Sequence, residues 1–257
     1  MWYGFMPFEV QTQPPGPGWS LTWEDHFNDL DQWRKRDVAR KPRKGFNWCF
    51  EADNVSVNHG RLRLKVTKSG NTIYCAAVDT YGKFAQKYGY FEARMKIAPV
   101  ARGIHSAFWM MAGNPNTKSG GVWSTGNQAN DGAEIDVCET VRYPGTTFAA
   151  GAVHWDGYGS HHRTSKPSYP DSPGIHNDDY HIYGVLWEAD KIEIYYDGTK
   201  VKTITNINHI PDVAEWLLLS NGVNWGNTSP NGSFPVTTYV DWVKVYKKSN
   251  SSSPGPG

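Results

Sequence analysis

Short segments in which apolar and polar residues alternate run along most of the chain. From Phe91 to Ile97 every second residue is apolar, and the residues from Ile192 to Tyr196 repeat this pattern. A period of two is typical of strands with one buried face, and no segment shows convincing helical periodicity. The pattern predicts strands at 19–24, 54–58, 61–67, 73–79, 88–97, 104–112, 133–141, 148–155, 181–188, 191–197, 200–204, 215–220 and 238–247.

Turn signals separate these segments, and Asp197-Gly198 is a strong hairpin signal. Many short strands at near-regular spacing predict an all-β fold, an antiparallel two-sheet β-sandwich. No linker interrupts the middle of the chain, so we expect one domain over residues 19–248. Residues 1–18 form an irregular Pro/Gly-rich leader, and residues 249–257 have the composition of a linker to a further module.

Composition excludes some classes of partner. The chain of 257 residues has 26 Lys and Arg against 25 Asp and Glu, which indicates neither a nucleic-acid nor an anionic-membrane surface. No stretch is apolar enough to span a membrane, and the first residues lack a signal-peptide pattern. The 12 Trp and 14 Tyr offer flat apolar faces that suit stacking on sugars. Three cysteines allow at most one disulfide, and whether Cys49 and Cys75 pair stays open.

Residues 133–141 carry the most concentrated candidate chemistry. Glu134 and Asp136 share one face of a strand, but strict alternation would place Glu139 on the opposite face. One extra residue between Asp136 and Glu139, a β-bulge, would return Glu139 to the acidic face. Such close carboxylates oppose each other's ionisation, so at least one proton stays bound near neutral pH. Side chains leaning over Asp136 would bring the two glutamates to roughly 5–5.5 Å, the separation in retaining glycosidases. An acidic strand edge or a cation site is the alternative.

This acidic strand resembles the E-x-D-x-x-E signature of glycoside hydrolase family 16 in its bulged form. Further landmarks of that family follow in order along residues 19–247: Trp23-Glu-Asp25-His-Phe27, Tyr88-Gly-Tyr-Phe-Glu-Ala-Arg94, Ala107-Phe-Trp109-Met, His154-Trp155, Tyr183-Gly-Val-Leu-Trp187 and Tyr239-Val-Asp-Trp-Val-Lys-Val-Tyr246. The resemblance implies a concanavalin-like β-jelly roll with a cleft across its concave sheet.

The resemblance also implies roles for individual residues. Glu134 would be the nucleophile, Glu139 the acid and then the base, and Asp136 an assisting carboxyl between them. His154 would lie in the cleft near them, while Trp155 alternates with it and would pack in the core. The candidates for binding sugar are Trp109, Trp123, His154, Arg94, Glu92 and Trp225. Glu92 and Arg94 also share one polar strand face, where we expect them to pair.

Members of this family often bind calcium, but no cofactor is expected to be required. The positions here would include the Gly60 carbonyl and Asp241, whereas His26 replaces an expected acidic ligand and makes a poor one. The spacing of His161, His162 and Cys138 does not indicate a zinc site. By the resemblance, the partner is a polysaccharide, the protein is a monomer, and it acts in an extracellular or periplasmic compartment.

The substrate is less constrained than the reaction. Relatives with a bulged strand cleave β-1,3-glucans or red-algal galactans. Residues 120–133 lack the Trp-Pro approach of laminarinases, and the segments 84–94 and 154–158 look more like agarases and porphyranases. Basic residues in one early loop favour a sulfated polymer, and the alternative is a solvated loop: Arg34, Lys35, Arg36, Arg40, Lys41, Arg43 and Lys44. We expect an agar- or porphyran-type galactan, with a laminarinase-like endo-β-1,3-glucanase, a transglycosylase or a non-catalytic carbohydrate-binding protein as alternatives.

Overall fold

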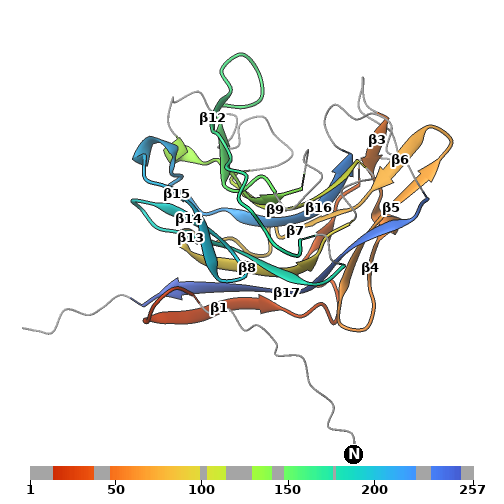
Figure 1. Ribbon diagram of the computed structural model, residues 1–257, viewed down its shortest axis with the longest axis horizontal. Helices are drawn as coiled ribbons and strands as arrows, with labels where there is room; N and C mark the ends of the chain where they lie inside the picture. The colour runs from red at the N-terminus through yellow and green to blue at the C-terminus, as the bar shows by residue number, and fades with distance from the viewer. Residues whose placement is uncertain are drawn as a thin grey trace, which may run out of the picture.

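Two stacked β-sheets build the domain (Figure 1). The computed structural model describes residues 14–37, 47–98, 103–113, 129–140, 148–175, 178–223 and 233–249. Short 3-10 turns are η1 (Ala52–Asn54), η4 (Ala129–Asp131) and η5 (Ile207–His209). Within the described ranges no helix has the length and apolar character needed to cross a membrane. Residues 1–13 of the expected leader and 250–257 of the expected tail lie outside these ranges.

The larger sheet has ten strands and forms the lower layer in Figure 1. Its main path is β15 (Thr199–Ile204), β14 (Ile192–Tyr196), β13 (His181–Trp187), β8 (Gly89–Lys96), β17 (Val236–Lys248), β5 (Leu62–Ser69), β6 (Thr72–Cys75) and β3 (Trp48–Phe50). Two further strands pair with this path, β1 (Trp19–Asp25) with β17 and β4 (Val55–Val57) with β5. Among the described pairs only β3–β6 is parallel, so the predicted antiparallel sandwich is confirmed.

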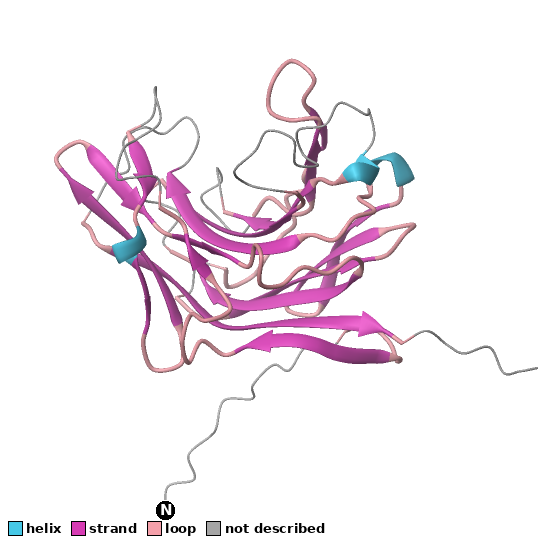
Figure 2. Cartoon of the chain, turned by 180° about the vertical axis from the view of Figure 1, so that it is seen from behind, coloured by secondary structure: helices cyan, strands magenta, loops and turns pink. Residues whose placement is uncertain are grey.

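The second sheet has seven strands, and its strands curve away from the larger sheet (Figure 2). Their order is β12 (Arg163–Ser165), β11 (Ala152–Trp155), β10 (Glu134–Glu139), β9 (Ile104–Met111), β16 (Trp216–Val223), β7 (Ala77–Asp79) and β2 (Arg34–Lys35). One face of this sheet covers the core, and the other face is turned outward.

The core fills the space between the sheets, as alternation predicts. Phe91, Ala93 and Met95 of β8 belong to it and are fully buried. The predicted strand 73–79 is interrupted at Ala76, where the chain passes from one sheet to the other. The buried amide of Asn221 holds this crossing, because its Oδ1 accepts from Ala76 N at 2.8 Å and its Nδ2 donates to the Leu64 carbonyl at 2.7 Å.

Candidate active site

Strand β10 carries three carboxylates on the outward face of the seven-stranded sheet. Its register with β9 shifts between Asp136 and Cys138, so the predicted bulge is confirmed. Val137 and Cys138 are consecutive, yet both are buried in the core. The extra inward residue therefore lets Glu139 share the outward face with Glu134 and Asp136.

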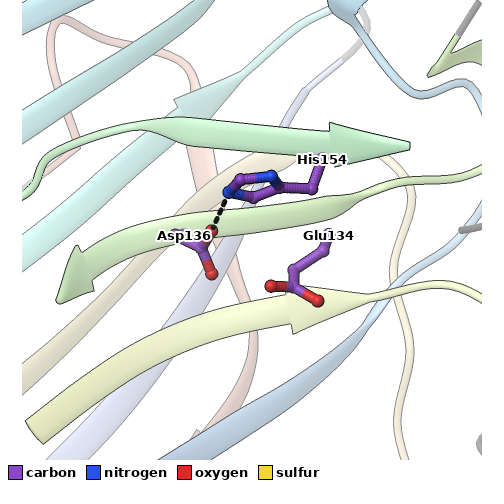
Figure 3. A group of neighbouring side chains, drawn as sticks. All are labelled: Glu134, Asp136 and His154. Carbon is purple, nitrogen blue, oxygen red and sulfur yellow. Dashed lines mark ion pairs between the residues drawn. The ribbon is translucent and has the colours of Figure 1, made fainter. Parts of the chain in front are cut away.

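Neighbouring strands add two side chains to this face. His154 of β11 lies directly opposite Glu134, and Trp109 of β9 lies opposite Asp136. Residues directly opposite on paired strands share a face and contact one another. The Nε2 atom of His154 lies 3.4 Å from Oδ2 of Asp136 (Figure 3). The structure thus gathers His154 and Trp109 beside the acidic residues, as the sequence predicts.

Burial controls the protonation of the three carboxyl groups. Removal from water raises the pKa of Glu134 to about 7, and the nearby Glu139 raises it further, against a hydrogen bond from Tyr158. Burial raises the pKa of Glu139 to about 7 as well. The pKa of Asp136 rises well above its ordinary value through burial and the charges of Glu139 and Glu134. These shifts favour the protonated form of Asp136, and near neutral pH the two glutamates can hold one ionised and one protonated carboxyl.

The histidine beside these carboxyls is uncharged. Burial lowers the pKa of His154 to about 4, with a smaller contribution from His162. The two imidazole rings stack at 5.0 Å, and His154 Nδ1 lies 2.9 Å from His162 Nε2. The contact between His154 and Asp136 consequently joins a neutral imidazole to a carboxyl whose protonated form is favoured. Ligand atoms of Glu134, Asp136 and His154 also lie within 4.8 Å of one another, a spacing that a divalent cation can bridge.

Two residues of this site were not predicted from the sequence. The hydroxyl of Tyr158 donates to Glu134, and its ring is half exposed at 50%. Glu215 is fully buried, and its Oε1 accepts from the backbone N–H of Ala133 at 3.1 Å. Burial raises the pKa of Glu215 well above its ordinary value, which favours the neutral carboxyl. The pair Asp156-Gly157 before Tyr158 is a turn signal that could have indicated a reversal there. No sequence signal connects Glu215 with Glu134.

Other predicted residues lie elsewhere. Glu92 and Arg94, predicted to bind substrate, do not lie on the acidic face, because β8 belongs to the ten-stranded sheet and both side chains alternate with its core residues. Arg94 Nη1 donates to Asp241 Oδ2 at 2.5 Å. Trp123 and Trp225 lie outside the described residues, as do Arg40, Lys41, Arg43 and Lys44.

The calcium position considered from the sequence does not have a suitable donor set. Asp241 accepts from Arg94, and Arg61 Nε lies 3.6 Å from its other oxygen. A cation near the Gly60 carbonyl would compete with two guanidinium groups for this carboxylate, and calcium needs several oxygen ligands. These residues therefore do not fit a calcium site.

Comparison with known proteins gives the family. Residues 42–244 match the family profile described as Glycosyl hydrolases family 16. The chain is 28% identical to glucan endo-1,3-beta-glucosidase A1 of Niallia circulans over 92% of its length, which is 39% of that protein. It is 29% identical to beta-porphyranase C of Zobellia galactanivorans over 95% of its length and 83% of that protein.

Solved structures show the same fold. A family 16 enzyme of a mixed-linkage glucan locus in Bacteroides ovatus, in complex with a product, superposes with a TM-score of 0.72 and 23% identity. The match covers 87% of this chain and 99% of that structure, which shows the shared fold. A profile match over most of the chain, together with the bulged acidic strand, shows that the chain belongs to glycosyl hydrolases family 16.

Proposed function

We propose that this domain is a retaining, endo-acting glycoside hydrolase that works by double displacement. The observation that carries the proposal is the pair Glu134 and Glu139 on one face of a bulged strand, with the pKa of each near 7. Such a pair supplies one ionised and one protonated carboxyl at neutral pH, which are the two groups that this reaction requires.

The reaction then proceeds in two steps. The carboxylate of Glu134 attacks the anomeric carbon while Glu139 gives its proton to the departing glycosidic oxygen, and a covalent glycosyl ester forms. In the second step Glu139 takes a proton from water, whose oxygen bonds to the anomeric carbon and releases Glu134. Asp136 in its protonated form, which burial favours, contributes no charge to oppose ionisation of Glu134, and Tyr158 stabilises the ionised form by donating a hydrogen bond.

Conservative substitutions test this mechanism. We expect Glu134→Gln and Glu139→Gln each to lower kcat at least about 10³-fold with an unchanged melting temperature, because each removes a required carboxyl. Glu188→Gln is the control, because it makes the same chemical change at a glutamate that pairs with Lys191 and Lys248 and takes no part in the proposed steps. Proton NMR of the first product should show the β-anomer. An α-anomer, or near-normal turnover by either variant, would contradict the mechanism.

For the substrate we propose a red-algal galactan of the agar or porphyran type. A row of paired residues supports this, since it crosses the outward face from Arg34 through Asp79, Leu218 and Trp109 to Asp136. Four strand spacings of about 4.8 Å make this row roughly 19 Å long. A polysaccharide lying along the row would meet the indole of Trp109 next to the reacting carboxyls and an arginine at the far end.

The far end of the row is positively charged. Arg34 binds the fully buried Asp79 through Nε at 2.8 Å and Nη2 at 3.0 Å, and Arg36 Nη1 adds a contact at 3.4 Å. Two guanidinium groups against one carboxylate leave a net positive charge, and Arg34 also lies over the ring of Tyr81 at 4.7 Å. Guanidinium groups bind sulfate oxygens well, so this end suits a sulfated sugar.

An endo-β-1,3-glucanase is the second candidate, and the similarity to the Niallia circulans glucanase favours it. The two candidates separate in one experiment that incubates the protein with agarose, porphyran, carrageenans, laminarin and mixed-linkage glucan. Product size and new reducing ends are the measurements. Cleavage of laminarin alone would contradict the galactan proposal, and no cleavage of any polymer would favour a carbohydrate-binding protein.

A polymeric substrate also bears on where the protein acts. Long polysaccharides do not cross a cell membrane unaided, so we propose that the protein works outside the cytoplasm, in an extracellular or periplasmic compartment. Activity on the intact polymer in the culture fluid or periplasmic fraction of the source cells would support this. Activity confined to the cytoplasmic fraction would contradict it.

A further inference from the structure

His162 contacts two side chains that in turn contact the reacting carboxyls. Its ring lies 5.0 Å from the ring of His154 and 4.9 Å from the ring of Tyr158. His154 contacts Asp136, and the hydroxyl of Tyr158 donates to Glu134. The steps of the proposed reaction do not use His162, although it is the residue that joins these two contacts.

The turn between β11 and β12 holds His162 on the acidic side of the sheet. Arg163, the first residue of β12, lies opposite Trp155 of β11, and the ring of Trp155 packs in the core as the sequence predicts. His162 directly precedes Arg163, and its contact with His154 places its ring on the outward side, because His154 lies opposite Glu134. The side chain of His162 is exposed there, so water can also reach its ring.

A hydrogen bond joins the two imidazoles. Nδ1 of His154 lies 2.9 Å from Nε2 of His162, which is the ordinary length of a hydrogen bond between two nitrogen atoms. His154 is uncharged near neutral pH, so one of its ring nitrogens donates and the other accepts. The partner of one nitrogen therefore decides which form the other nitrogen takes.

Asp136 shows which of the two tautomers of His154 fits the site. Nε2 of His154 lies 3.4 Å from Oδ2 of Asp136 (Figure 3), and this buried oxygen has no other hydrogen-bond partner among the described residues. Burial favours the protonated carboxyl, which can donate to His154 only where Nε2 carries a lone pair. The proton of the neutral ring then lies on Nδ1 and faces His162. A buried carboxyl oxygen is rarely left unpaired, because that carries a desolvation penalty.

We propose that His162 is a positioning residue, which accepts a hydrogen bond from Nδ1–H of His154 and so keeps the Nε2 lone pair directed at the proton of Asp136. No proton leaves this row of groups during the reaction. The opposite tautomer of His154 would donate to Asp136 and favour its charged form, which opposes ionisation of the nucleophile Glu134. This inference rests on the proposed function and deepens it, because it adds a residue that acts on the same site from outside the carboxyl cluster.

Two substitutions separate the hydrogen bond from the packing of the ring. His162→Phe keeps an aromatic ring beside His154 and Tyr158 but has no acceptor, whereas His162→Gln carries an amide oxygen at the same number of bonds from Cα as Nε2. We expect His162→Phe to lower kcat about fivefold to tenfold with little change in KM, and His162→Gln to keep most of the activity. The control is His161→Phe, the same change at the exposed neighbouring residue, which should alter neither constant.

Nitrogen-15 NMR of the histidine side chains reads the tautomer of His154 directly and needs no substrate. The signal of His154 is assigned by its loss in His154→Gln. At pH 7, where this ring is uncharged, we expect the Nδ1–H tautomer in the wild-type protein and in His162→Gln. In His162→Phe the signal should move toward the Nε2–H tautomer, because Nδ1–H has lost its acceptor.

The outcomes separate this inference from the proposed function. An unchanged tautomer in His162→Phe would overturn the role of His162, and so would equal losses of kcat in His162→Phe and His162→Gln, which would indicate packing alone. If the wild-type protein cleaves no polymer, the proposed function fails, and the NMR measurement still decides whether His162 sets the tautomer.

Discussion

Replacing Tyr158 with phenylalanine should shift the pH dependence of the reaction in a known direction. The Tyr158 hydroxyl donates a hydrogen bond to Glu134, and this bond lowers the pKa of a carboxyl that burial otherwise raises. The bond favours the ionised form, which is the form that attacks. Tyr158→Phe therefore raises the pKa of Glu134 and moves the acidic limb of kcat/KM to higher pH.

The size of the shift follows from the hydrogen bond. A bond to a charged group contributes about 1.5–3 kcal/mol, and the half-exposed ring of Tyr158 places this one at the lower end. A contribution of about 1.5 kcal/mol corresponds to a shift of about one pH unit. The basic limb reports loss of the proton from Glu139 and should stay in place. The bell-shaped profile should narrow, and its maximum should fall.

The measurement is kcat/KM from pH 4 to pH 10 on the polymer that the substrate panel identifies. Tyr239→Phe is the matched control, because Tyr239 lies on β17 of the ten-stranded sheet and should leave both limbs unchanged. An acidic limb that does not move, or that moves to lower pH, would refute the assignment of Tyr158 as the donor to an ionised nucleophile.

Three further predictions follow from the same site. Glu215→Gln should raise the melting temperature at pH 8 and leave it unchanged near pH 4. The pKa of Glu215 is higher in the folded protein than in the unfolded chain, so the stability due to the neutral carboxyl is lost as pH rises. Calorimetry that finds the variant and the wild-type protein equally stable at both pH values would contradict this. Zinc should inhibit by bridging Glu134, Asp136 and His154, whereas EDTA should leave activity unchanged, and loss of activity in EDTA would indicate a required metal. Trp109→Ala should raise KM with little change in kcat if its indole binds a sugar, and an unchanged KM would remove it from the cleft.

The local pattern of apolar and polar residues was sufficient to predict the acidic strand and the buried face of the core strands. The spacing of Glu134, Asp136 and Glu139 predicted the bulge, and alternation predicted the buried face of β8. The same alternation does not say which sheet a strand joins. That is why Glu92 and Arg94 were assigned to the cleft although their strand lies in the other sheet. The packing of the whole fold, rather than the alternation of apolar residues, decides which sheet a strand joins.

Tertiary pairing determined what the sequence could not. β2, β3 and β12 have two or three residues each and are too short to show a period, so they were missed. The segment 73–79 was predicted as one strand because its local pattern does not indicate the change of sheet at Ala76. That change depends on the side chain of Asn221, which is far away in the chain. Glu215 reaches Ala133 in the same way, through the pairing of β16 with β9 and of β9 with β10.

The residues that would choose the substrate are separated from the residues that would cut it. Glu134, Asp136 and Glu139 lie on one six-residue strand, whose chemistry suits any β-linked sugar. Arg34 lies on the edge strand β2 of the same sheet, four strands away from β10. Its guanidinium is cationic and is not part of the acidic cluster. Substitution at this edge should therefore change which polymer binds while the cleavage step keeps its rate, because binding away from the reacting bond affects the ground state and the transition state alike.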